Sequence, residues 1–137
     1  MATFELTETN LDSSIKDNDI LIIDFWAEWC GPCRGFAPVF EAASERFEGV
    51  AFAKCDTEAQ QAVAASFGIR SIPTVAIFRE QVLLYLQPGA LPAAGLDDVL
   101  GQVQALDMAD IRAKIAAEKA AEEKAAEEKA AEEKSES

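Results

Sequence analysis

The sequence contains no histidine and only three cysteines among its 137 residues. A structural zinc site normally needs four Cys or His ligands, so we expect no metal site. An odd number of cysteines, two of them in a Cys-x-x-Cys pair, is also unlike the disulfide framework of a small secreted protein.

The N-terminus, Met1-Ala2-Thr3-Phe4-Glu5, does not consist of a basic segment followed by an apolar one. We therefore expect no signal peptide. No apolar run approaches the roughly 18 residues of a membrane helix. Basic residues are scarce as well, with 12 Lys and Arg against 25 Asp and Glu and a net charge of −13. We therefore expect a soluble, cytoplasmic protein with neither nucleic acid nor membrane as a partner.

The C-terminal part has a composition of its own. It repeats Lys-Ala-Ala-Glu-Glu at residues 119–123, 124–128 and 129–133. These residues favour helix, but a five-residue period advances ~140° per repeat, so the alanines never align into a stripe that a partner could bury. We predict a globular domain over residues 1–107 and a solvated helical or disordered tail over residues 108–137. Residues 112–137 carry a net charge of −2, so −11 belongs to the remainder of the chain.

Apolar patterning in residues 1–107 predicts alternating strands and helices. Strands are expected at residues 3–6, 20–27, 50–55, 74–78 and 82–86, and helices at residues 9–17, 32–47, 58–67 and 96–106. The connection Arg79-Glu80-Gln81 is short enough only for an antiparallel hairpin, although it lacks the usual turn Gly or Asn. This order implies an α/β fold with a central mixed five-stranded sheet and helices on both faces.

The stretch Trp29-Cys30-Gly31-Pro32-Cys33 lies between an apolar strand and an amphipathic helix. The free N–H groups and the dipole at the start of that helix favour a thiolate on Cys30, which is the reactive form of cysteine. Pro32 suits the first helical turn because it lacks a backbone N–H. Cys33, one turn along, is close enough to Cys30 to form a disulfide. The spacing therefore predicts a redox dithiol.

Two charged residues interrupt apolar strands. Asp24 is either a turn or cap residue or, because it lies inside an apolar run, a buried carboxylate whose pKa is raised. Lys54 lies in mid-strand and needs either a partner or an exit to solvent. Cys55, next to it, is expected to be a small core residue.

These features together resemble the thioredoxin family. The resemblance rests on residues 25–34, on Pro38, and on residues 68–74 with their Ile-Pro-Thr, and it covers roughly residues 3–106. It implies a thioredoxin fold and a protein-disulfide reductase, in which Cys30 attacks a substrate disulfide and Cys33 resolves the mixed disulfide. Thioredoxin reductase would restore the dithiol with NADPH and its own flavin, so the chain itself would hold no cofactor beyond its redox-active disulfide.

The resemblance also implies roles around the dithiol. Asp24 would accept the proton of Cys33 and would be paired with Lys54. The Ile72–Pro73 bond would be cis, and the backbone of Ile72 would bind the substrate chain. Further substrate-binding residues would be Trp29, Gly31, Pro32, Pro73 and Gly89, with Trp26 and Pro38 as structural residues near the site.

Other functions remain open for this pattern. An oxidase or isomerase on the same fold is the nearest enzymatic alternative, but the Gly-Pro between the cysteines resembles the reducing branch. The alternative from another class is a non-catalytic binding or chaperone module that uses the apolar groove. Disulfide-containing proteins are the expected substrates, and we expect a monomer.

Overall fold

The computed structural model describes residues 3–136. The chain divides into two compact units, Met1–Gln104 and Ala105–Ser137. Within the described residues, no helix combines the length and the apolarity needed to cross a lipid bilayer.

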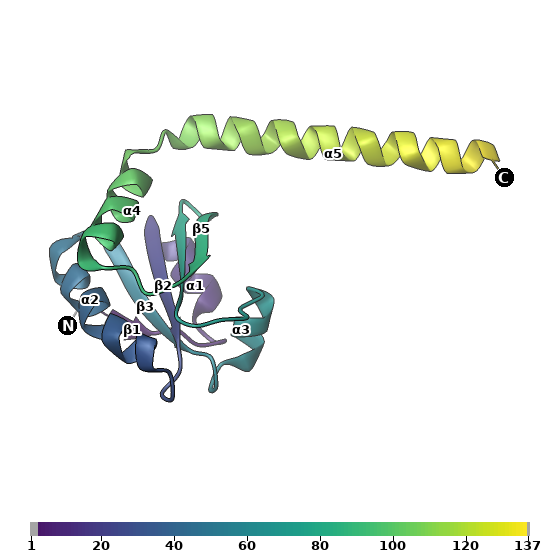
Figure 1. The fold of residues 1–137 in the computed structure, drawn as a ribbon. Helices are drawn as coiled ribbons and strands as arrows, with labels where there is room; N and C mark the ends of the chain where they lie inside the picture. The colour runs from purple at the N-terminus through teal and green to yellow at the C-terminus, as the bar shows by residue number, and fades with distance from the viewer. Residues whose placement is uncertain (1–2, 137) are drawn as a thin grey trace. The chain divides into compact units, whose positions relative to one another are not determined.

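The first unit is built on a mixed sheet of five strands in the order β1-β3-β2-β4-β5 (Figure 1). Strands β1 (Thr3–Glu5), β2 (Ile20–Trp26) and β3 (Val50–Asp56) are parallel to one another. Strands β4 (Thr74–Arg79) and β5 (Val82–Pro88) continue the sheet in antiparallel pairing. Every residue of β2 except the last is buried, as a strand covered on both faces requires. The predicted sheet is confirmed.

Helices cover both faces of this sheet. The bounds are α1 (Leu11–Asp17), α2 (Gly31–Arg46), α3 (Gln61–Ser66) and α4 (Ala93–Ala105). Successive side chains of a strand point to opposite faces, so β2 contributes to two separate cores. Ile22 packs with Phe36 and Phe40 of α2 and Leu96 of α4. On the other face, the core contains Leu21, Ile23 and Phe25 with Val63 of α3, and side chains of α1 pack against it.

Helix α3 begins three residues later than the predicted start at residue 58. The reason is a turn in which the carboxylate of Asp56 accepts hydrogen bonds from the backbone N–H groups of Glu58 and Ala59, at 2.9 and 3.4 Å. Gly68, with φ +65°, follows the helix in the left-handed conformation that glycine adopts without strain.

The hairpin between β4 and β5 has a connection of only two residues, Glu80 and Gln81, with φ angles of +50° and +70°. Two successive left-handed residues match the twist of the flanking strands, and Asn-Gly is the usual choice there. This chain forms the turn without glycine, so both side chains lie in a disfavoured backbone conformation.

The second unit consists mainly of helix α5 (Met108–Glu136), 29 residues long. The side chains of residues 112–134 are all exposed. The tail is therefore one continuous helix, the first of the two states expected for it, and it has no buried face over this range.

Candidate functional site

The two cysteines of the motif lie at the N-terminus of α2 and are joined by a disulfide, with their Cα atoms 5.2 Å apart. Cys30 is the N-cap residue, and the backbone N–H of Cys33 donates to its Sγ at 3.2 Å. Gly31 and Pro32 occupy the first turn. A donor on this sulfur and the positive end of the helix dipole both stabilise negative charge on Cys30 once the disulfide is reduced.

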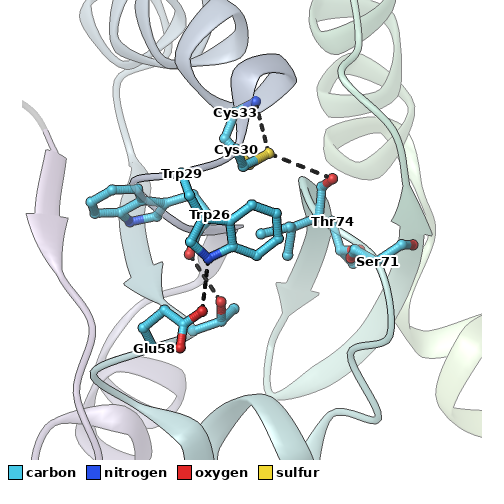
Figure 2. Close-up of a disulfide and its surroundings, with 9 residues drawn as sticks. Trp26, Trp29, Cys30, Cys33, Glu58, Ser71 and Thr74 are labelled. Carbon is cyan, nitrogen blue, oxygen red and sulfur yellow. Dashed lines mark hydrogen bonds between the residues drawn. A yellow bond between two sulfur atoms is a disulfide. The ribbon is translucent and has the colours of Figure 1, made fainter.

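A second segment approaches the disulfide from the start of β4. The Ile72–Pro73 peptide bond is cis, and the carbonyl oxygen of Ile72 lies 3.8 Å from Sγ of Cys30 (Figure 2). The backbone N–H of Gly89 donates to the carbonyl of Pro73 at 2.8 Å. Gly89 has φ +118°, a conformation that favours glycine. The fold thus brings three segments that are distant in sequence to one place.

Trp29 is the most exposed large apolar side chain near the disulfide, with 67% of its surface accessible. Its indole Nε1 donates to Oε1 of Glu58 at 2.7 Å. Sequence reasoning did not find Glu58 as a neighbour of the site, because this contact spans 29 residues and depends on the turn that Asp56 forms. The only sequence feature that could have indicated this role is the acidic side chain of Glu58 shortly after the strand predicted at residues 50–55.

Asp24, in β2, is fully buried. Neither of its carboxylate oxygens has a hydrogen-bond partner among the described residues. Burial raises its pKa from 3.8 to about 7, and the positive charge of Lys54 opposes that rise. The expectation of a buried carboxylate with a raised pKa is confirmed.

Asp24 and Lys54 interact through their charges, since Lys54 lowers the pKa of Asp24, but no hydrogen bond joins them. The two residues are neighbours across the parallel strands β2 and β3, but Nζ of Lys54 lies 5.1 Å from the ring centroid of Trp26 and forms no hydrogen bond to Asp24. Lys54 is only partly buried, so its ammonium group can stay hydrated while its stem packs on apolar surface, whereas a direct pair would need both charges buried. The aromatic face also attracts the cation.

Two further residues have structural positions around the site. The carbonyl of Trp26 accepts hydrogen bonds from the backbone N–H and the hydroxyl of Thr57, at 2.9 and 3.2 Å. Pro38 lies inside the continuous helix α2.

Cys55 is a buried free cysteine in the core, as expected, and burial raises the pKa of its thiol to about 11. It is therefore protonated at neutral pH and unreactive.

Within the part of the chain that the structure describes, no cluster of three or more His, Cys, Asp or Glu side chains could hold a metal ion. The groups that can react at the site are the sulfur atoms of Cys30 and Cys33. A dithiol that closes into a disulfide transfers two electrons.

The family model named Thioredoxin matches residues 2–102. The chain belongs to the thioredoxin family. It is 53% identical over 119 residues, 87% of this chain and 89% of the relative, to a Streptomyces coelicolor protein named "Putative thioredoxin 2". It is 36% identical over 104 residues to the thioredoxin of Porphyra purpurea, covering 74% of this chain and 97% of that protein.

Solved structures agree with this assignment. A mutant thioredoxin from Halobacterium salinarum has a TM-score of 0.72 and 32% identity, over 77% of this chain and 93% of the other. The fold is therefore the thioredoxin fold, with α5 added at its C-terminus. As a thioredoxin with a Cys30–Cys33 disulfide, the chain is a thiol–disulfide oxidoreductase.

Proposed function

We propose that this thioredoxin reduces disulfide bonds of cytoplasmic proteins and is itself re-reduced by thioredoxin reductase, using NADPH and that enzyme's flavin. The observation that carries the proposal is the position of Cys30, at the N-terminus of α2 and 3.8 Å from the backbone carbonyl of Ile72. The Gly31-Pro32 pair between the cysteines is similar to the reducing branch of the family. The proposal assigns the activity to residues 1–107, acting as a monomer.

The exchange takes place in two balanced steps. The Cys30 thiolate attacks one sulfur of the substrate disulfide, which forms a mixed disulfide and releases the other substrate sulfur as a thiolate. Cys33 then loses its proton and attacks Sγ of Cys30, which forms the intramolecular disulfide and releases the second substrate sulfur. Two electrons pass to the substrate, and the protein is left in the oxidised state in which the structure shows it.

Asp24 is proposed as the group that accepts the proton of Cys33. Its pKa of about 7 supports this role, since a proton acceptor works best when its pKa is near the operating pH. Lys54 is proposed to act on Asp24 through its charge, because its ammonium group lowers the pKa of the carboxyl without a direct hydrogen bond.

Substrate binding is proposed along the surface that surrounds the disulfide. The exposed ring of Trp29 would form one wall with Gly31 and Pro32. The segment Ile72–Pro73 and Gly89, which the hydrogen bond between Gly89 and Pro73 holds together, would form the opposite wall. The backbone of Ile72 would pair with the substrate chain, as an extended peptide pairs with an exposed strand edge.

The proposal is tested by NADPH consumption with thioredoxin reductase and insulin as the disulfide substrate. Turnover is expected for the intact chain and should be lost in the double variant Cys30→Ser, Cys33→Ser. Biological activity that survives in this double variant would instead favour the non-catalytic binding module. Net oxidation of reduced proteins in preference to reduction of insulin would favour the oxidase.

The order of attack gives a separate prediction. Cys33→Ser should accumulate mixed disulfides through Cys30 when the protein is passed through a cell extract, because the resolving thiol is gone. Cys30→Ser is the matched control and should trap little, since the N-cap position and the N–H donor that stabilise a thiolate belong to Cys30 and not to Cys33. Equal trapping by both variants would contradict the assignment of Cys30 as the attacking thiol.

A further inference from the structure

The basic side chains of the first unit are few, and most of them have a partner. Lys16 pairs with Asp12 and Arg46 with Asp97, at 2.9 and 2.6 Å. Arg79 donates to backbone carbonyls at the end of α4, and Lys54 lies over Trp26. Arg34 and Arg70 have no hydrogen bond or ion pair through their guanidinium groups within the described part of the chain. Both are close in sequence to the site, one beside Cys33 and the other two residues before Ile72.

Arg70 lies at the rim of a pocket of about 230 Å³, here called the Arg70 pocket. Phe67, Ile69 and Leu86 form its apolar walls, and Arg70, Ser71 and Thr74 are its polar lining residues. Among the described residues, no carboxylate lines this pocket. Arg70 is therefore the one charged group that an occupant would meet there.

The Arg70 pocket is lined by residues next in sequence to the proposed substrate surface, with Pro88 preceding Gly89. Ser71 and Thr74 flank the Ile72–Pro73 segment, and the hydroxyl of Thr74 donates to the carbonyl of Ser71 at 2.6 Å. Figure 2 shows Ser71 and Thr74, the first residue of β4, on the same side of the disulfide as the carbonyl oxygen that faces Cys30. A peptide that pairs with the backbone of Ile72 would thus pass the mouth of this pocket within a few residues of its own cysteine.

The size of the pocket limits what can enter. A water molecule takes ~30 Å³ of liquid volume, so the pocket holds much more than a bridging water. It is smaller than the ~300 Å³ at which pockets for whole small molecules begin. A single side chain fits this range. Apolar walls suit a methylene stem, and an unpaired guanidinium suits a carboxylate, with which it can form a bidentate pair.

We propose that the Arg70 pocket binds an acidic side chain of the substrate, glutamate above all, close in sequence to the attacked cysteine. This preference for acidic sequences rests on the proposed reductase function and names its substrate class. The net charge of −11 on residues 1–111 repels acidic chains over most of the domain. Arg70 therefore favours an acidic side chain at one position of the substrate, whereas the rest of the domain disfavours negative charge.

The test uses symmetric disulfide dimers of a nine-residue peptide with one central cysteine, so that attack on either sulfur places the same peptide in the groove. Glutamate is placed in turn at each of the four positions before and after the cysteine, with glutamine at the same position as its neutral control. The second-order rate constant is measured with the pre-reduced full chain, from tryptophan fluorescence in a stopped-flow instrument. At one of these positions, glutamate should be faster than glutamine by about two- to fivefold, the size of an exposed ion pair.

Variants of the protein assign that preference. Arg70→Gln should abolish it and Arg70→Glu should reverse it, whereas Arg34→Gln, the other unpaired arginine, should keep it. The proposal is overturned if no position prefers glutamate, if the preference survives in Arg70→Gln, or if Arg34→Gln loses it equally, which would show a general field effect. A further peptide carries leucine at the position where glutamate is preferred. If it reacts as fast as the glutamate peptide with both the wild type and Arg70→Gln, the proposal is also overturned. Failure to reduce even the glutamine peptides is a different result and refutes the reductase function itself.

Discussion

Asp24→Asn is expected to stabilise the fold and to slow disulfide exchange. The carboxylate is fully buried without a hydrogen-bond partner among the described residues, so its ionised form is costly in the folded state. Asparagine has nearly the same shape and removes the charge. It also removes the proposed proton acceptor for Cys33, and turnover should therefore fall.

The size of the effect follows from the pKa. Burial raises the pKa of Asp24 from 3.8 to about 7, and each unit corresponds to ~1.36 kcal/mol, so ionisation destabilises the folded state by about 4 kcal/mol. Below pH 3.8 the carboxyl is protonated in both the folded and the unfolded state, and the penalty is absent. Between pH 3.8 and 7 only the unfolded state releases the proton, so the stability of the wild type falls relative to that of the variant. Above pH 7 the difference is constant.

Urea unfolding of the two oxidised proteins at a series of pH values measures this difference directly. The free energy of unfolding of Asp24→Asn minus that of the wild type should rise from pH 4 to pH 7 and then level off. Asp19→Asn, which changes an exposed carboxylate, is the matched control and should show no such rise. A difference that does not change with pH would refute the buried ionisation. Lowered stability with unchanged turnover would mean that Asp24 has only a structural role.

Three further predictions concern single features of the structure. Lys54→Gln should raise the pKa of Asp24 above about 7, because the Lys54 charge lowers it; an NMR titration of the Asp24 carboxyl carbon that shows no rise would exclude the charge effect. Gln81→Gly should stabilise the protein by ~1 kcal/mol, since the native φ of +70° is strained for glutamine, and a melting temperature that fails to rise would contradict this strain. Truncation after Ile115 should reduce the helical circular dichroism signal while activity and melting temperature stay the same, because residues 116–134 are exposed; a melting temperature lowered by ~4 °C or more, about 1 kcal/mol for a domain of this size, would show that the tail is packed.

The sequence alone was sufficient wherever the deciding interactions are local. Cys30 and Cys33 are three residues apart at a helix start, so their disulfide and the polarity of their environment follow from helix geometry. The burial of β2 follows from its continuous apolar run, and that run also indicated that Asp24 is buried. Gly68 ends α3 because it adopts positive φ without strain.

Contacts between distant segments were decided only by the tertiary structure. The sequence placed Lys54 near Asp24 but could not show that the ammonium group of Lys54 lies over Trp26. The direction of the Lys54 side chain depends on where solvent and the Trp26 ring lie in the folded protein. Glu58 meets Trp29 across 29 residues only because the Asp56 turn delays the start of α3. The Arg70 pocket likewise needs residues 67–71 after α3, the start of β4 and the end of β5 to be packed together. No local pattern encodes this arrangement, because it arises from the order of strands in the sheet.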